Sequence, residues 1–139
     1  MSDCIFCDIL RGDRPGTLVY EDDLAVALLD LFPVHEGHTL VIPRNHVQDL
    51  ATCPPDLAGH LIAVSGRLAR VVTEVTAAQA FNVWTASGKA AGQEVFHLHL
   101  HILPRYCDDA FGLRFPVGYP KEAAREDLEA MAARIKARL

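Results

Sequence analysis

Three histidines occupy alternate positions in one short segment, at His97, His99 and His101, and each gap between them holds an apolar residue. In a β-strand, successive side chains point to opposite faces, so the imidazoles would share one face and the apolar residues the other. Imidazole can act as a nucleophile, an acid or base, or a metal ligand. Two chemistries therefore fit: covalent attack on phosphorus by one supported histidine, or chelation of a catalytic Zn²⁺ by all three. A single histidine in such a segment could also lack any chemical role.

A second group of reactive side chains stands at Cys4 and Cys7, which have CxxC spacing. The sequence predicts no strand before this pair, as a thioredoxin-like redox motif would require, so a metal site or a pair of reduced thiols remains. Cys53 and Cys107 are interpreted as ordinary thiols. Neither a signal peptide nor a run of 18 apolar residues is visible, which predicts a cytoplasmic protein with no membrane partner.

Composition limits the remaining possibilities. The chain has 139 residues, half of them apolar and 22% charged, and this predicts a single folded domain spanning 1–139. Its net charge of −5 has the wrong sign for attraction to a phosphate backbone, so we expect no nucleic acid partner. The chain has neither a GxGxxG nor a GxxxxGK[ST] motif, which argues against a Rossmann domain and a P-loop.

The elements that must position these residues follow from apolar periodicity. It predicts strands over 17–20, 24–29, 38–43, 81–85 and 95–103, a long helix from 55 to about 79, and an amphipathic helix in the last 19 residues, from 121. We expect Pro104 to end the last strand. Most strand connections are short enough for antiparallel pairing. The predicted class is therefore α+β, an antiparallel β-meander with one long helix packed on it and a C-terminal helix.

The segment HLHLHIL at 97–103 resembles the motif of the histidine triad (HIT) family, in which apolar residues separate three histidines. The flanking segments AGQEV, PR, LDLFPV and GHTLVIP are also typical of that family in order and spacing. The resemblance covers a motif-bearing core at 4–105, whereas the tail at 106–139 carries little of it. It implies a HIT-like fold and a homodimer.

The resemblance also implies a reaction. HIT proteins hydrolyse or transfer nucleotides at the α-phosphorus, with the central histidine as nucleophile. His99 would then form a nucleotidyl intermediate, His101 would hydrogen-bond the phosphate or leaving group and help to protonate it, and His97 would support both. Purine nucleoside phosphoramidates are the first substrate class predicted, and dinucleoside polyphosphates (ApnA-type) are the alternative. A nucleotide-binding scaffold with incidental catalysis is a third hypothesis.

Further positions match nucleotide-binding residues of the family. Asp30 matches a ribose-binding acid, although it could be a turn residue, and Asn82 matches a residue that borders the phosphate site, although it could merely lie at a strand edge. Gln93 and the backbone from 92 to Val95 resemble a phosphate-binding loop, with Glu94 expected to turn outward. His38 is either a support for the site or a structural hydrogen-bond donor. The positions that match the base pocket, each of which could be plain core, are Ile5, Phe6, Ile9, Leu28, Leu31 and Leu40. His35 and His60 are expected to be solvated.

Some bacterial HIT proteins resemble this chain in carrying the CxxC pair with two histidines, here His46 and His97. The resemblance implies a structural Zn²⁺ held by Cys4, Cys7, His46 and His97, and not required for chemistry. Reduced cysteines without metal are the alternative. The zinc site weakens the three-histidine metal hypothesis, because His97 cannot easily serve both.

Overall fold

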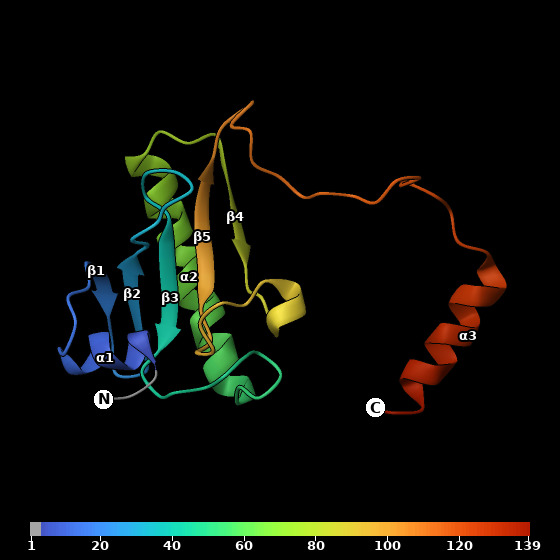
Figure 1. Cartoon of the computed structure of the whole chain (residues 1–139), viewed down its shortest axis with the longest axis horizontal. Coiled ribbons are helices and arrows are strands. Elements are labelled where there is room, and N and C mark those ends of the chain that lie inside the picture. Colours follow the sequence, from blue (N-terminus) through green and yellow to red (C-terminus); the bar gives the residue numbers. More distant parts are fainter. Residues whose placement is uncertain (1–3) are drawn as a thin grey trace. The chain divides into compact units, whose positions relative to one another are not determined.

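The structure is a computed structural model that describes residues 4–139, and five of its strands form one antiparallel sheet (Figure 1). In chain order the elements are α1 (Ile5–Arg11), β1 (Leu18–Glu21), β2 (Ala25–Leu29), β3 (Thr39–Pro43), α2 (Pro55–Val75), β4 (Ala80–Trp84), the 3₁₀ turn η1 (Lys89–Ala91), β5 (Leu100–Arg105) and α3 (Arg125–Lys136). The predicted α+β class, with an antiparallel sheet, a long helix and a C-terminal helix, is confirmed. Two compact units divide the chain after Asp109, and each is described by itself.

The strand order in the first unit is β1-β2-β3-β5-β4. The first three strands follow one another as a meander, and α2 then carries the chain across the sheet to β4 at its far edge. β5 returns between β3 and β4 and pairs antiparallel with both. The strand that follows the histidine segment therefore lies inside the sheet, where side chains from both neighbours can reach it.

The boundaries of the histidine strand differ from the prediction. Residues 95–99 belong to no strand, and β5 runs from Leu100 through Pro104 to Arg105. β3 pairs with β5 only as far as Ile102, so Pro104 lies where β5 has a single neighbour, and its missing N–H is tolerated there. Leu98 instead donates its backbone N–H to the Val47 carbonyl at 2.6 Å, which holds the segment before β5 against the loop after β3.

Other elements also differ at their ends. The long helix stops at Val75, where Ala77 takes a positive φ of 52°, and the last helix begins at Arg125. The sequence reasoning missed α1, a helix of seven residues that is too short to show clear periodicity. Cys4 caps this helix, since its sulfur accepts a hydrogen bond from the backbone N–H of Cys7 at 3.5 Å.

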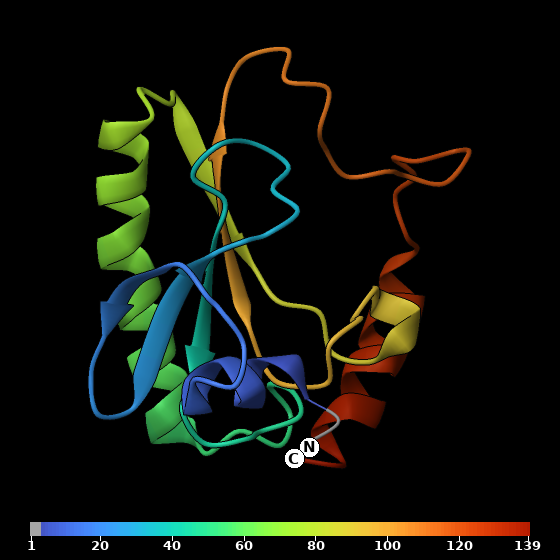
Figure 2. The same ribbon diagram turned by 60° about the vertical axis from the view of Figure 1, so that its left-hand side comes forward.

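A helix covers each face of the sheet (Figure 2). On one face, α2 buries Leu61 and Val64 against apolar residues of the central strands. On the other face, Phe6 of α1 packs in a second cluster. The fully or nearly buried sheet residues on the α2 side are Ala25, Ala27, Val41, Leu100 and Ile102, and those on the α1 side are Val26, Leu28, Leu40 and Ile42. Leu98, Leu100 and Ile102 thus face α2, as their alternation with the histidines predicted.

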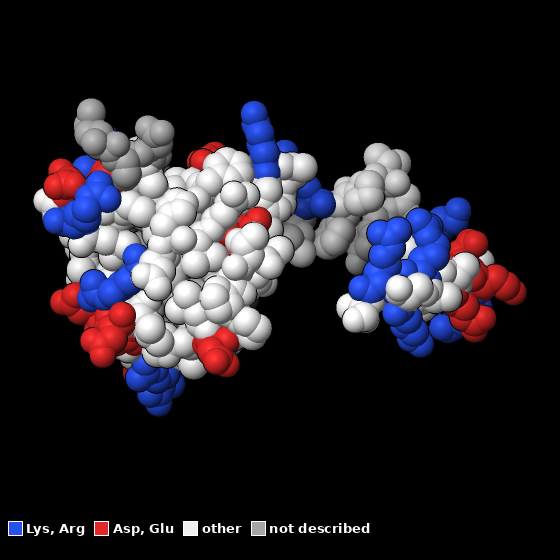
Figure 3. All heavy atoms as spheres, turned by 90° about the horizontal axis from the view of Figure 1, so that it is seen from below, with Lys and Arg blue, Asp and Glu red and all other residues white. Residues whose placement is uncertain are grey.

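The second unit, Ala110–Leu139, contains α3. Its apolar residues Leu128, Met131 and Ile135 are each about half exposed. Figure 3 shows Lys, Arg, Asp and Glu side chains of both signs on this helix, and mixed signs at the margins of a largely uncharged face of the first unit. No helix within residues 4–139 is long and apolar enough to cross a membrane.

Candidate active site and metal cluster

His97 is completely buried, and its two ring nitrogens have distinct partners. Nε2 lies 2.9 Å from the carbonyl oxygen of Pro43. A carbonyl can only accept, so Nε2 carries the hydrogen and Nδ1 keeps its lone pair. That lone pair faces sulfur, because Nδ1 lies 3.4 Å from Sγ of Cys4 and 3.6 Å from Sγ of Cys7. This tautomer is the one that ligates a metal through Nδ1.

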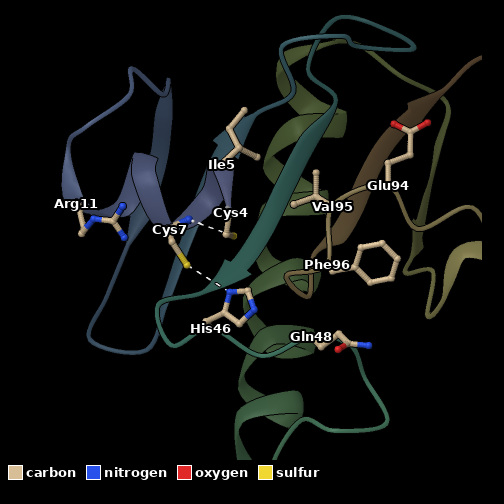
Figure 4. Close-up of a pocket in the computed structure, with 9 residues that line it drawn as sticks. All are labelled: Cys4, Ile5, Cys7, Arg11, His46, Gln48, Glu94, Val95 and Phe96. Atoms are coloured by element: carbon tan, nitrogen blue, oxygen red, sulfur yellow. Dashed lines mark hydrogen bonds between the residues drawn. The ribbon is translucent and has the colours of Figure 1, made fainter. Parts of the chain in front are cut away.

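Cys4, Cys7, His46 and His97 form one cluster whose ligand atoms all lie within 4.8 Å of one another. Nδ1 of His46 completes it at 3.3 Å from Sγ of Cys7 (Figure 4). In a tetrahedral zinc site with ordinary bond lengths, sulfur and nitrogen ligands lie about 3.6 Å apart. The observed separations match that edge length, so the donor types and their spacing fit a closed Cys₂His₂ site. The sequence prediction that these four residues converge agrees with this geometry.

Local structure explains how the cluster forms. Cys4 caps α1 and Cys7 lies one turn later, so the helix brings both sulfurs to the same end. His46 follows β3 and His97 precedes β5, and these strands are neighbours in the sheet. Burial, reinforced by the Cys4 sulfur, raises the pKa of the Cys7 thiol above its usual value.

His99 has the tautomer that a nucleophile needs. Its Nδ1 lies 2.7 Å from the backbone carbonyl oxygen of His97, so Nδ1 donates and Nε2 of the neutral ring carries the lone pair. Phe6 packs edge-on against the imidazole, with ring centroids 5.2 Å apart. The hydroxyl of Thr85, just after β4, donates to the backbone carbonyl of His99 at 2.8 Å. The ring and its backbone are therefore fixed from α1 and from the β4 side.

A hydrogen bond from His38 determines which nitrogen of the His101 ring carries the hydrogen. The backbone N–H of Val34 donates to Nδ1 of His38 at 3.2 Å, so that nitrogen must be an acceptor and Nε2 must carry the hydrogen. Nε2 of His38 lies 2.9 Å from Nδ1 of His101 and donates to it. Nε2 of His101 is left with a hydrogen to donate. The amide of Val34 thus sets the direction of both hydrogen bonds, because an amide N–H cannot reverse.

His38 and His101, the hydrogen-bonded pair that we call the histidine relay, are both held neutral. Burial and, to a lesser extent, the neighbouring His99 and His38 rings together lower the pKa of His101 to about 4, although the Asp30 carboxylate opposes the shift. Burial likewise lowers the pKa of His38, although Asp30 opposes the shift. At neutral pH, His101 is consequently a hydrogen-bond donor rather than a source of a proton.

Asp30 immediately follows β2 and makes the turn contact that was one of the two interpretations of it. Its Oδ1 accepts the backbone N–H of Phe32 at 2.9 Å, which stabilises the turn. Its Oδ2 lies 3.7 Å from Nδ1 of His38, so the carboxylate also borders the histidine relay. One carboxylate oxygen of Asp30 and one ring nitrogen each of His38 and His101 lie within 4.8 Å of one another.

Gln93 organises the loop before the histidine segment. Its Oε1 accepts the backbone N–H of Gly88 at 2.8 Å, and its Nε2 donates to the carbonyls of Gln48 at 2.7 Å and Val95 at 3.2 Å. The buried side chain is committed to these backbone groups, so any contact with phosphate would come from the loop that it holds. Glu94 is exposed, as expected, and lines an open pocket of 590 Å³ beside Cys7 and His46 (Figure 4).

The remaining predicted binding residues do not all meet. Phe6, Leu28 and Leu40 are buried together, with Ile9 and Val95 packed against them, so the structure places them in the core on the α1 side of the sheet. Ile5 is 40% exposed and Leu31 is 81% exposed. Asn82 is exposed on β4 and accepts a hydrogen bond from Arg105 at 2.5 Å.

Two histidines expected to be solvated have partners instead. His35 Nε2 lies 3.0 Å from Asp109 and His60 Nε2 lies 2.8 Å from Asp22, and both side chains are less than one-third exposed. The prediction failed because these partners are remote in sequence. Sequence reasoning also gave no role to Trp84, which stacks on His101 with ring centroids 4.5 Å apart and planes 5° apart. Only the register between β4 and β5 could have found it.

These features form one compact site, which combines the hydrogen-bonded pair His38 and His101, the imidazole of His99 with a lone pair on Nε2, and an adjoining Cys₂His₂ cluster. A family model described as "HIT domain" matches residues 11–108, and the chain belongs to the HIT family. A HIT family protein from Bacillus anthracis, known from its crystal structure, is 37% identical with a TM-score of 0.91, and the match covers 99% of this chain and 98% of that one.

Two other similar proteins bear on chemistry. A Zn-bound histidine triad family protein from Mycobacterium smegmatis is 37% identical with a TM-score of 0.76, over 99% of this chain and 98% of that one. Adenylylsulfatase HINT3 from Arabidopsis thaliana is 38% identical over 75% of this chain, which matches 53% of that protein's length. The CxxC and histidine residues of this chain fit the zinc-binding type of the family.

Proposed function

We propose that this protein is a nucleotide hydrolase that cleaves purine nucleoside phosphoramidates at the α-phosphorus through a nucleotidyl-His99 intermediate. The observation that carries the proposal is the pair of fixed tautomers: a lone pair on Nε2 of His99 beside a hydrogen on Nε2 of His101. The ring centroids of His99 and His101 are 5.0 Å apart, so one phosphoryl group can meet both. Membership of the HIT family supports the same chemistry.

In the first step, Nε2 of His99 attacks phosphorus, the P–N bond breaks, and the departing amine takes a proton from solvent. The His99 ring becomes cationic, and its Nδ1–H strengthens its hydrogen bond to the His97 carbonyl. In the second step, water attacks phosphorus, the bond to His99 breaks, and the proton returns to solvent. Covalent catalysis of this kind divides one difficult displacement into two easier ones.

His101 stabilises the charge that develops on the phosphoryl oxygens or the leaving group. The neutral ring donates from Nε2, and the low pKa argues against the proton-donating role that the resemblance implied. The carboxylate of Asp30 is suited to accept ribose hydroxyls, and His97 and His38 hold the reactive rings in place. We also assign nucleotide contacts to the loop held by Gln93.

Mass spectrometry tests the intermediate. After mixing with adenosine 5′-phosphoramidate and rapid acid-free quenching, the wild type should gain one adenylyl group, and His99→Ala should gain none and lose turnover. His60→Ala is a matched control, since His60 lies on α2 against Asp22. An unmodified wild type that still turns over substrate, or a fully active His99→Ala, refutes the proposal. Comparing phosphoramidates with dinucleoside polyphosphates selects between the two substrate classes, and nucleotide binding without any turnover would favour a scaffold protein.

We propose further that Cys4, Cys7, His46 and His97 hold a structural Zn²⁺, which when bound would cross-link the N-terminal helix to the segment before β5. The separations of the donor atoms and the Nδ1 lone pair of His97 support this proposal. Metal analysis should find one zinc per chain, and the double variant Cys4→Ser/Cys7→Ser should lose it. Cys107→Ser, at an exposed cysteine, should keep it. A double variant that retains zinc contradicts the site, and loss of all turnover on chelation without an adenylyl intermediate would favour zinc-dependent hydrolysis.

We also propose a cytoplasmic location, a homodimer, and a single HIT domain over 1–139 with 106–139 as its tail. The family match, which ends at residue 108, supports the division into core and tail. A CxxC pair whose sulfurs lie in a metal-type cluster, rather than in a disulfide, is compatible with a reducing compartment. Analytical ultracentrifugation tests the dimer.

A further inference from the structure

Trp84 and His101 are direct cross-strand partners in the β4–β5 ladder, so their side chains lie on the same face of the sheet. The indole and imidazole stack almost parallel, at 5°, with centroids 4.5 Å apart. Trp84 also lies 5.9 Å from the His38 ring, at a tilt of 36°. The aromatic side chain of an edge strand thus touches both rings of the relay.

The hydrogen bond from His38 fixes only one point of the His101 ring. Because a hydrogen bond tolerates a range of angles, a ring held by Cβ and by this one bond can still tilt and turn its Nε2–H away from a phosphoryl oxygen. His99 meets His101 at 63°, and His38 meets it at 40°, so neither lies flat against the imidazole. Trp84 does lie flat against it, and tilting the imidazole would lose that stacking contact.

We propose that Trp84 is a positioning residue, which fixes the plane of the His101 imidazole so that its Nε2–H points toward the reacting phosphoryl group. Trp84 forms no bond to substrate in this role. The inference rests on the proposed function, because the direction of the Nε2–H matters only if His101 acts on phosphorus. It also makes a claim about the free protein, the stacked ring, that can be measured without substrate.

The first measurement concerns the free protein. Because the His101 ring stacks on the indole, its Hε1 and Hδ2 resonances should be shifted upfield by the indole ring current in ¹H–¹³C NMR spectra. Trp84→Leu should remove that shift, and Trp84→Phe should retain part of it. Trp84 is the chain's only tryptophan, so the protein's tryptophan fluorescence reports the surroundings of this one side chain, and AMP binding should change it. Absence of the upfield shift from the wild type overturns the inference whatever the activity.

The second measurement is kinetic. The interaction free energy of an aromatic pair of this kind corresponds to about a 2- to 13-fold change in rate. The kcat of Trp84→Leu should therefore fall by that factor, while KM changes less. Trp84→Phe should lose less, because it keeps an aromatic face. Phe81→Leu is the control: Phe81 is a half-exposed aromatic residue of the same strand, on the opposite face. If Trp84→Leu does not fold, Trp84→Met takes its place under the same limits.

The outcomes separate the two proposals. An unchanged kcat in folded Trp84→Leu overturns the positioning role. A rise in KM alone also overturns it, because Trp84 would then be part of the substrate-binding surface. A wild type that shows the stacked ring but forms no adenylyl intermediate overturns the proposed function instead. The kcat loss together with the lost ring-current shift is the result expected.

Discussion

Replacing His38 by phenylalanine removes the hydrogen bond that sets the tautomer of His101. His38 is 4% exposed and donates to His101 Nδ1 across 2.9 Å, and the ring shape of phenylalanine fills nearly the same space. Without that donor, the hydrogen of His101 can move to Nδ1, which leaves Nε2 unable to donate. A neutral hydrogen bond contributes about 0.5–1.5 kcal/mol, so kcat/KM should fall by about 2- to 13-fold.

The assay is steady-state hydrolysis of adenosine 5′-phosphoramidate, with ¹⁵N NMR of the histidine rings as an independent readout. Wild-type His101 should show a protonated Nε2 and a bare Nδ1, and His38→Phe should show a mixture. His38→Gln keeps an amide N–H near the same place, so it should lose less activity than His38→Phe. His60→Phe, a histidine changed in the same way on α2, controls for general effects.

Two results would refute the reasoning. The first is a wild-type His101 with its hydrogen on Nδ1, because the Val34 amide could not then have set the direction of the relay. The second is a His38→Phe protein that keeps full kcat/KM although its His101 tautomer has changed. Equal losses in His38→Gln and His38→Phe would assign the effect to packing instead of hydrogen bonding.

Three further predictions concern stability. The pKa of His101 is about 4 in the folded protein against an ordinary 6.5, so the unfolded state binds more protons between these values. The stability that neutral His101 contributes is therefore present above pH 6.5 and is lost as pH falls through 4. Urea titrations should show a loss of about 2 kcal/mol over this range, allowing for the partial exposure of the ring, and a smaller loss in His101→Gln. Leu61→Ala should lower the free energy of unfolding by about 2–5 kcal/mol, whereas Ile62→Ala, at a 56% exposed neighbour, should cost far less in the same titration. Gly37 and Gly12 both have positive φ, but a Cβ on Gly37 would lie 2.7 Å from Thr76 Cγ2, whereas one on Gly12 would meet nothing within 4 Å. Gly37→Ala should therefore have a lower Tm than Gly12→Ala by calorimetry. Equal Tm values would contradict the steric argument.

The histidine segment shows why some site features could be predicted and others could not. Alternation of imidazoles and apolar residues predicted that Leu98, Leu100 and Ile102 would enter the core, and they do so even though the strand begins only at Leu100. Side-chain alternation is a local property of extended backbone. Strand limits depend on which neighbour is present, and β3 and β5 pair along only part of their lengths.

The sequence by itself determined the family, the donor types of the Cys₂His₂ cluster and the presence of three histidines on one segment, because these follow from residue identity and short spacing. Only the folded chain decided which nitrogen of each ring carries a hydrogen, and for His97 and His101 the deciding group comes from a remote segment. The Pro43 carbonyl, the His97 carbonyl and the Val34 amide make those assignments for His97, His99 and His38. Pro43 and Val34 belong to segments distant in sequence from the triad, so no local pattern could reveal them. The three triad histidines differ in their hydrogen bonding because the fold gives each ring a different partner.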